Sequence, residues 1–450
     1  MFNLSDTICA ICTPKGTGAI AAIRISGSDS WNIARKIFFP SSSFNHMHAI
    51  HGHIKDNEKI IDEVVLLPYK SPKSFTLEDT IEIFCHGGLQ VTSQILDICL
   101  KAGARQAKNG EFTFRAFING RIDLTEAEAI NELISADNEK AVYVASEILS
   151  GSLKKKIIQF REKLFELITQ IESSIEFPMD VPDTGRDKIV LNLQNIKNEI
   201  NNLIESSKEG QILRDGIKIS IIGPPNAGKS SLLNQLLESD RAIVSEEPGT
   251  TRDTIEEKII IDGWPIVLID TAGIREKKSI SNSEKTGIER SKQAIQKSDI
   301  VLAIFDIVND DHKNRTFTAF LENKSRIIIG NKIDLLNGKL IDKNKYDVLI
   351  SAKNGTNIDK LKKIILEKID FPPSPSCLLS PIHINQRQKE LLIQCNFALE
   401  NSISLANKSL SEDLISDELK NAVSKLDEIS GRAVSDAVIQ NIFAKFCIGK

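Results

Sequence analysis

The stretch Gly223-Pro224-Pro225-Asn226-Ala227-Gly228-Lys229-Ser230 has the spacing G-x-x-x-x-G-K-S. Residues 217–222 before it are apolar and β-branched, which predicts a buried strand, and residues 231–237 after it predict a helix. Strand, glycine-rich loop and helix form a phosphate-binding context, because backbone N–H groups and the positive helix end then point at one phosphate. The stretch therefore predicts an α/β nucleotide-binding domain, in which Lys229 reaches the β- and γ-phosphates and Ser230 binds Mg²⁺.

Further short motifs follow at predicted strand ends. Residues 248–253 read P-G-T-T-R-D, and a threonine there, Thr251, offers Mg²⁺ a second hydroxyl. Residues 270–273 read D-T-A-G, where Asp270 can hold Mg²⁺ directly or through water and the Gly273 N–H can sense the γ-phosphate. Together with the motifs below, they predict a bound nucleoside triphosphate with Mg²⁺.

The run Asn331-Lys332-Ile333-Asp334 selects guanine, because the Asp334 carboxylate accepts both N1–H and N2–H of that base. Ser351-Ala352-Lys353 supplies a loop whose backbone N–H meets guanine O6. The nucleotide is therefore predicted to be GTP. The predicted GTP-binding residues are Gly223, Asn226, Ala227, Gly228, Lys229, Ser230, Ser231, Ser245, Glu246, Glu247, Pro248, Gly249, Thr250, Thr251, Asp270, Thr271, Ala272, Gly273, Asn331, Lys332, Asp334, Ser351, Ala352 and Lys353.

One position departs from the usual GTPase pattern. Many GTPases carry a glutamine directly after D-x-x-G to orient the attacking water, whereas this chain has Ile274. The isoleucine side chain can neither donate nor accept a hydrogen bond, so it cannot orient the water. No arginine is evidently placed to stabilise the charge that develops on the phosphates. Another group must supply both roles, or hydrolysis is very slow.

The remaining pattern predicts three regions. Residues 1–120 are mixed with strands dominant, 121–213 and 377–450 are helical, and 214–376 alternate strand and helix around the phosphate loop. The simplest arrangement is one helical domain with the doubly wound α/β domain inserted between its halves. Thr125-Glu126-Ala127-Glu128 matches a capping box, and Gly210 is the predicted end of a helix that starts near Arg186.

Composition narrows the class of protein. The 450 residues suit two or three domains, and a net charge of −4 argues against a chain that coats nucleic acid. No apolar run is long enough to span a membrane and the N-terminus has no secretion signal, so we expect a cytoplasmic protein. The seven cysteines are scattered, which suits reduced thiols.

Two clusters of side chains each leave two interpretations open. Cys9-x-x-Cys12 is either a redox or metal pair or part of the core. His46, His48, His51 and His53 form either a metal site or a solvated hairpin, and no completing ligand is evident nearby.

The GTPase motifs combine with others into a resemblance to the MnmE (TrmE) family of tRNA uridine-modification GTPases. The motifs G-x-P-N-A-G-K-S, P-G-T-T-R-D, D-T-A-G-I-R and G-I-E-R occur in order. Outside them the chain carries R-A-F-x-N-G at 115–120, L-T-E-A-E-A at 124–129 and a terminal C-I-G-K. The resemblance covers the whole chain.

The resemblance implies a folate-binding, dimer-forming N-terminal α+β domain and a helical domain that carries an inserted Ras-like G domain. It implies a homodimer that acts with an FAD-containing partner, MnmG, in a heterotetramer on certain tRNAs. The product would carry an aminomethyl or carboxymethylaminomethyl group on C5 of the wobble uridine. The carbon would come from 5-formyl- or 5,10-methylene-tetrahydrofolate.

The resemblance also assigns site residues. Potassium would replace the arginine finger, bound at Asn226, Ser245, Glu247 and Thr250, and Glu284 would orient the attacking water beside Lys229. Cys447 matches a terminal thiol that is either reactive or structural. The folate site would comprise Arg24, Glu82, Arg121 and Lys450.

Two alternatives remain. A regulatory GTPase of the ribosome-assembly type would share every GTPase motif, but it would lack the N-terminal motifs and the C-I-G-K end. The N-terminal domain could also serve only for dimerisation, without folate. Titration with 5-formyltetrahydrofolate separates these alternatives from the folate-dependent reading.

Overall fold

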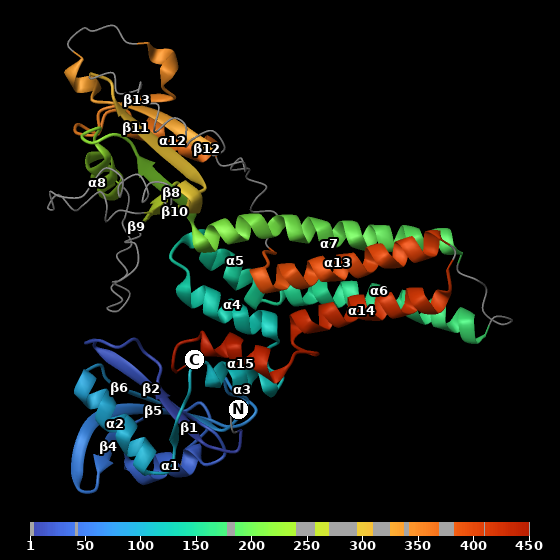
Figure 1. Ribbon diagram of the computed structural model, residues 1–450. Coiled ribbons are helices and arrows are strands. Elements are labelled where there is room, and N and C mark those ends of the chain that lie inside the picture. Colours follow the sequence, from blue (N-terminus) through green and yellow to red (C-terminus); the bar gives the residue numbers. More distant parts are fainter. Residues whose placement is uncertain are drawn as a thin grey trace. The chain divides into compact units, whose positions relative to one another are not determined.

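A computed structural model describes most of the chain (Figure 1). The described residues are 4–40, 44–177, 185–239, 257–269, 295–308, 325–336, 342–368, 382–408 and 410–449. The chain divides into two compact units, of which the first comprises Met1–Asn131, Ile148–Asn198 and Glu390–Lys450. The second comprises Glu132–Glu147 and Glu199–Lys389. The architecture is the predicted one: an N-terminal sheet domain, a helical domain and, inserted in it, an α/β domain that carries the phosphate loop.

The first unit begins with a seven-stranded sheet in the order β3-β4-β5-β6-β2-β1-β7. Its neighbours pair antiparallel, except that β7 joins β1 in parallel. Alternating apolar residues put one face of the sheet into the core, as expected for half-buried strands. The strands are β1 Ile8–Ile11, β2 Ile20–Ser26, β3 Phe38–Phe39, β4 Ile50–Asp56, β5 Lys59–Tyr69, β6 Thr80–His86 and β7 Arg105–Gln106.

Two helices, α1 Ser30–Ile37 and α2 Leu89–Lys101, pack on this sheet. Their buried residues join the sheet core, including Ile33 from α1 and Cys99 from α2. Cys9 of β1 belongs to the same core, and burial raises the pKa of its thiol to about 12. The core interpretation of Cys9-x-x-Cys12 is therefore the one that the structure supports.

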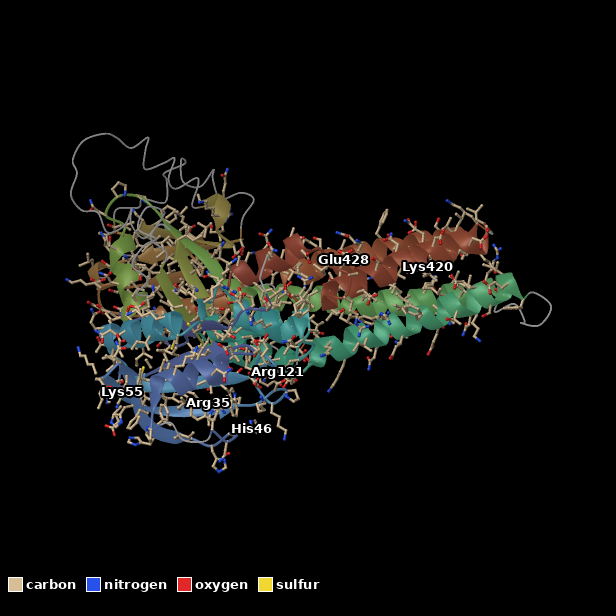
Figure 2. The ribbon with its side chains drawn as sticks, turned by 90° about the horizontal axis from the view of Figure 1, so that it is seen from below. Arg35, His46, Lys55, Arg121, Lys420 and Glu428 are labelled. Atoms are coloured by element: carbon tan, nitrogen blue, oxygen red, sulfur yellow. The ribbon has the colours of Figure 1, made fainter. Side chains whose placement is uncertain are left out.

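The histidines lie on a hairpin. His51 and His53 belong to β4, which pairs antiparallel with β5, and His51 Nε2 lies 2.7 Å from Glu63 Oε1. Figure 2 labels His46 on the same domain. Among the described residues, no group of three or more histidine, cysteine, aspartate or glutamate side chains could hold a metal ion. Of the four histidines, His51 and His53 therefore lie on the β4–β5 hairpin, and His46 and His48 precede it.

Helix α3, Glu111–Ile118, joins the sheet to the C-terminal end of the chain. Phe114 and Phe117 of α3 pack on Phe443 of α15, Asp436–Ala444, with ring centroids 5.5 and 6.0 Å apart. Leu124 and Phe446 complete this cluster. The chain's last helix is thus anchored by aromatic side chains within the first unit.

The capping box predicted at Thr125–Glu128 was wrong by two residues. Helix α4 runs Leu124–Ser135, and Asp123 is the residue that caps it. Glu126 N donates to Asp123 Oδ1 at 2.9 Å, and Asp123 N donates to Glu126 Oε2 at 2.7 Å. Aspartate caps a helix as well as threonine does. The structure therefore uses the D-x-x-E pattern of Asp123 and Glu126 and not the T-x-x-E pattern of Thr125 and Glu128.

The helical domain contains long helices whose apolar stripes face one another. Helices α6, Ser152–Glu176, and α14, Glu412–Ser430, lie side by side (Figure 1). Lys420 projects from α14, as Figure 2 shows, and its Nζ lies 2.6 Å from Glu172 Oε1 on α6. The other helices are α5 Glu139–Leu149, α7 Arg186–Asp215 and α13 Gln386–Asn407.

The predicted end of α7 at Gly210 was also wrong. The helix continues through Gly210 to Asp215, and the residue with a left-handed backbone is Gly216, at φ 74°. A glycine inside a helix costs only about 1 kcal/mol, so its presence does not force an end. Gly216 then leads directly into the first strand of the G domain.

The second unit holds a six-stranded sheet in the order β13-β12-β11-β8-β10-β9. All its pairs are parallel except β9–β10, so its chemistry is expected at the carboxyl edge. Strand β11 is buried at every position, as strands covered on both faces are. The strands are β8 Ile217–Ile222, β9 Glu257–Ile261, β10 Trp264–Ile269, β11 Ile300–Asp306, β12 Ser325–Asn331 and β13 Val348–Ile350.

The described helices of this sheet are α8 Lys229–Ser239, α12 Ile358–Lys368 and the 3₁₀ turns η3 Ile333–Leu335 and η4 Lys343–Lys345. No helix in the described part of the chain is both long and apolar enough to cross a bilayer.

Candidate nucleotide site and N-terminal ligand site

The phosphate loop lies between β8 and α8, at the carboxyl edge of the second sheet. The close approach of other backbone and side-chain atoms requires two glycines in it. A Cβ on Gly223 would collide with the carbonyl oxygen of Ile304, and one on Gly228 would collide with the Asn331 side chain. Gly228 also has φ 103°, a region that other residues rarely adopt. The predicted strand, loop and helix are therefore confirmed here.

Lys229 lies inside the loop. Its ammonium donates to the carbonyl oxygens of Gly223 and Pro224, each at 2.8 Å. Burial lowers the pKa of this lysine, so the charged form is held at a desolvation cost. An anionic phosphate placed in the loop would offset that cost. Ser230 and Ser231 follow in the first turn of α8, at the positive end of the helix.

Asn331 joins the phosphate loop to the loop after β13. Its Nδ2 donates to Ala227 O at 2.8 Å, and its Oδ1 accepts from Ala352 N at 2.9 Å. The Asn331 side chain is buried, so both bonds are shielded from water. Three predicted binding segments are thus brought together by one amide.

The residues predicted to recognise the base are arranged around η3. Ser351 Oγ donates to Asp334 Oδ1 at 2.7 Å, which orients a carboxylate that is otherwise exposed. Lys332 has φ 74°, and its Nζ lies 2.7 Å from Oδ2 of the buried Asp306. Lys353 follows in the same loop as Ser351. The arrangement leaves the second oxygen of Asp334 for a donor on the base.

Several predicted residues lie outside the described residues. They are Ser245, Glu246, Glu247, Pro248, Gly249, Thr250, Thr251, Asp270, Thr271, Ala272, Gly273, Glu284 and Lys450. Asn226, the predicted potassium ligand within the described loop, has a left-handed backbone at φ 64°.

Arg24 and Glu82 meet in the first sheet. They are directly opposite on the antiparallel strands β2 and β6, and Arg24 Nε and Nη2 lie 2.9 and 2.8 Å from Glu82 Oε1. Both side chains are about one-fifth exposed, at 20% and 18%. Tyr69 Oη donates to Glu82 Oε2 at 3.4 Å, and burial followed by the Glu82 charge raises the pKa of this tyrosine.

Arg121 lies near this pair, and both arginines place their guanidinium groups over the Phe75 ring. The guanidinium carbon of Arg121 is 4.7 Å from the Phe75 ring centroid, and that of Arg24 is 5.1 Å away. Arg121 Nη1 also donates to Phe75 O at 2.7 Å. Burial and the nearby charge of Arg24 lower the pKa of Arg121, so a bound anion would relieve repulsion between the two cations.

The C-terminal segment lies against the same domain. Gly110 N donates to Cys447 O at 3.3 Å. Gly449, at φ 94°, packs so closely on β1 that a Cβ there would collide with Ile11 O. Ile11 is adjacent to Ala10, which pairs with Arg24. Cys447 itself is an exposed free thiol.

Two contacts of these sites were not predicted from the sequence. Asp306 ends the apolar strand I-V-L-A-I-F-D, and a carboxylate at that strand end was a usable signal. Phe75 lies in a loop with no distinctive pattern, so nothing local indicated it. The motif R-A-F-x-N-G at 115–120 contributes to the family resemblance, but the resemblance assigns no role to Arg115.

These features define a P-loop GTP-binding protein. Residues 124–447 match the MnmE helical domain, and residues 7–121 match the GTP-binding protein TrmE N-terminus. The chain is 40% identical over 456 residues to a tRNA modification GTPase MnmE from Thermotoga petrophila, covering 99% of this chain and 100% of that one. A relative of the same name from Acetivibrio thermocellus is also 40% identical, over 99% of each chain.

The chain therefore belongs to the MnmE family of tRNA modification GTPases. A solved structure of Aquifex aeolicus Era bound to GDP and AlF4⁻ aligns with a TM-score of 0.26 and 26% identity. That alignment covers 40% of this chain and 65% of Era.

Proposed function

We propose that this protein hydrolyses GTP to drive a tetrahydrofolate-dependent modification at C5 of the wobble uridine of certain tRNAs. It acts as a homodimer together with an FAD-containing partner of the MnmG type, in the cytoplasm. The modification adds an aminomethyl or carboxymethylaminomethyl group. The observation that carries the proposal is the cluster of Arg24, Glu82 and Arg121 beside the C-terminal segment.

The chemistry of this cluster suits folate. A pterin presents adjacent N–H donors, and Glu82 is a carboxylate that its arginine partner holds in one orientation. Folate also ends in a glutamate with negative charge, and Arg121 is an exposed cation whose repulsion from Arg24 an anion would relieve. Arg24 thus positions the carboxylate while Arg121 binds the tail, with Lys450 as a further cation.

The nucleotide site supplies the second half of the function. Lys229 and the loop N–H groups bind the phosphates, and Asp334 with Ser351 selects guanine. Ser230, Thr251 and Asp270 suit Mg²⁺, which would neutralise charge between the phosphates. Because Ile274 cannot orient water, we assign that role to Glu284. Charge neutralisation is assigned to K⁺ held by Asn226, Ser245, Glu247 and Thr250.

Deleting residues 447–450 tests the two-site proposal. Binding of 5-formyltetrahydrofolate and wobble-uridine modification should be lost, while GTP binding stays intact because the G domain has its own sheet. Calorimetry with 5-formyltetrahydrofolate should give the same loss for Glu82→Ala. If both variants bind folate like the full chain, the site is wrong.

The ribosome-assembly alternative predicts a different outcome. A purely regulatory GTPase would leave wobble nucleosides unchanged when the gene is deleted. Nucleoside analysis of tRNA from such a strain therefore separates the two functions. A domain used only for dimerisation would form the dimer and yet show no heat of folate binding.

A further inference from the structure

Residues 70–79, called the strap from here on, join β5 to β6 and carry an aromatic side chain to the N-terminal ligand site. The strap is closed by its own hydrogen bonds. Ser71 Oγ donates to Leu77 O at 2.8 Å, and Lys70 Nζ lies 2.6 Å from Asp79 Oδ2. A loop braced in this way is expected to shift as one piece when an outside contact is lost.

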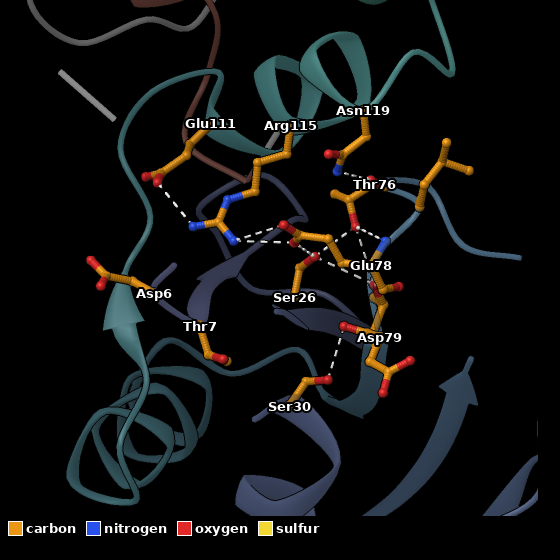
Figure 3. A network of polar contacts seen from close by, with 12 residues as sticks. Asp6, Thr7, Ser26, Ser30, Thr76, Glu78, Asp79, Glu111, Arg115 and Asn119 are labelled. Atoms are coloured by element: carbon orange, nitrogen blue, oxygen red, sulfur yellow. Dashed lines mark hydrogen bonds and ion pairs between the residues drawn. The ribbon is translucent and has the colours of Figure 1, made fainter. Parts of the chain in front are cut away.

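Helix α3 holds the strap from outside, as Figure 3 shows. Arg115 Nη1 donates to both carboxylate oxygens of Glu78, at 3.2 and 3.1 Å. Asn119, the residue that directly follows α3, also reaches the strap, because its Nδ2 donates to Thr76 O at 2.7 Å. These contacts lie on either side of Leu77 and fix the strap against α3.

Arg115 is the deepest member of this contact. Its side chain is fully buried, and its second carboxylate partner is Glu111, which Arg115 Nη2 approaches at 3.4 Å. Arg105 also pairs with Glu111, at 2.6 Å, but reaches Asp6 and not the strap. A buried guanidinium is tolerated only in a well-matched geometry, so Arg115 constrains Glu78 more strictly than an exposed pair could.

We propose that Arg115 is a positioning residue of the N-terminal ligand site. By holding Glu78, it keeps the strap where the Phe75 ring contacts the guanidinium groups of Arg24 and Arg121. Arg115 is fully buried, so it acts through the strap and not on the ligand. The inference rests on the proposed folate function for its consequence, but the position of the strap can be measured without any ligand.

The first experiment measures hydrogen exchange of the strap amides in the ligand-free full chain. Arg115→Lys keeps the charge but loses the planar fork, so exchange over residues 70–79 should accelerate by about tenfold. Arg105→Lys is the matched control, because it changes an arginine on the same Glu111 that does not touch the strap. Equal exchange in the two variants would overturn the proposal.

The second experiment measures 5-formyltetrahydrofolate binding by calorimetry. Arg115→Lys should weaken binding by about tenfold through displacement of the site, and Arg105→Lys should not. In a Phe75→Leu background, Arg115→Lys should add little further loss, because the two changes act through one element. A general loss of folding would instead lower the melting temperature without this non-additivity.

The outcomes separate the two levels of the inference. If the wild-type chain binds no folate, the proposed function fails, and the exchange measurement still decides whether Arg115 holds the strap. If folate binds and the losses of Arg115→Lys and Phe75→Leu simply add, Arg115 does not act through Phe75. In that case the positioning role is wrong.

Discussion

The two candidate sites are built on sheets of opposite kind. The nucleotide site lies at the carboxyl edge of a mainly parallel sheet, where β8, β10, β12 and β13 are each followed by a short motif. The N-terminal ligand site lies on paired antiparallel strands, where Arg24 and Glu82 stand opposite each other within the strands. In the mainly parallel sheet the candidate site follows strand ends, and in the antiparallel sheet it follows cross-strand register.

The sharpest test of the nucleotide site is Asp334→Asn. The new amide would place a donor opposite guanine donors, so GTP affinity should fall by about 10⁴-fold, while xanthosine triphosphate should gain. Equilibrium binding of both nucleotides checks this. Asp359→Asn, at a side chain that is 96% exposed on α12, is the control. An unchanged nucleotide preference would show that this motif does not read the base.

The second test concerns the part of the nucleotide site that no strand-end motif explains. If K⁺ supplies the missing charge, GTP hydrolysis should be about 100-fold faster in KCl than in NaCl at fixed Mg²⁺. GTP affinity should change far less. The rate should also depend on protein concentration, because two G domains must meet. Equal rates in the two salts would remove potassium from the mechanism.

The third test addresses the cross-strand pair. Arg24→Met leaves the Glu82 carboxylate without its arginine partner, so 5-formyltetrahydrofolate affinity should fall by about 10- to 100-fold, with GTP affinity unchanged. Arg35→Met is the matched control, because Arg35 of α1, which Figure 2 labels, also lies over a ring, that of Phe44 at 5.7 Å, and is not part of the Arg24–Glu82 pair. Equal losses in the two variants would mean that the pair has no special role.

The smallest expected effect is a pH dependence in the first unit. Burial alone would raise the pKa of Glu111, but hydrogen bonds from Arg105 and from Lys108 N outweigh it, and the pKa is lowered. Its contribution to stability is therefore complete above the unfolded value of about 4.3 and is lost as pH falls through the folded value.

Glu111→Gln should thus flatten the fall in melting temperature between pH 7 and pH 3 by a few degrees, on the order of 4 °C. Differential scanning calorimetry over this range checks the slope. Glu63→Gln, at an exposed residue paired with His51, should leave the slope as it is. A steeper slope in Glu111→Gln would contradict the sign of the pKa shift.

The comparison also explains what could be predicted from sequence. The phosphate loop was predictable because strand, loop and helix are contiguous, and β8 and α8 lie where expected. The strand-rich character of residues 1–120, which include Arg24 and Glu82, was also predictable. Their pairing was not, because 58 residues separate them and register emerges only when the sheet forms. Only the resemblance nominated these two residues together.

Sequence signals for helix ends and helix caps gave wrong predictions where two candidate residues lay close together in the chain. Gly210 looked like a helix end, but the left-handed position is Gly216. Asp123 and Thr125 both head a capping pattern, and the structure uses Asp123. Arg115 had no local signal as a buried residue, since arginine is seldom fully buried and its carboxylates come from separate segments.

The bridging amide of Asn331 has a consequence for how the nucleotide site can change over time. The Asn331 side chain makes one hydrogen bond to each of two loops that are distant in sequence, at Ala227 and at Ala352. Any replacement would leave a buried donor or acceptor unpaired in one loop or in both. During evolution, a substitution of Asn331 would therefore be tolerated only after compensating changes in both loops. The Asn331 amide therefore restricts which substitutions the nucleotide site can accept during evolution, in addition to joining the two loops.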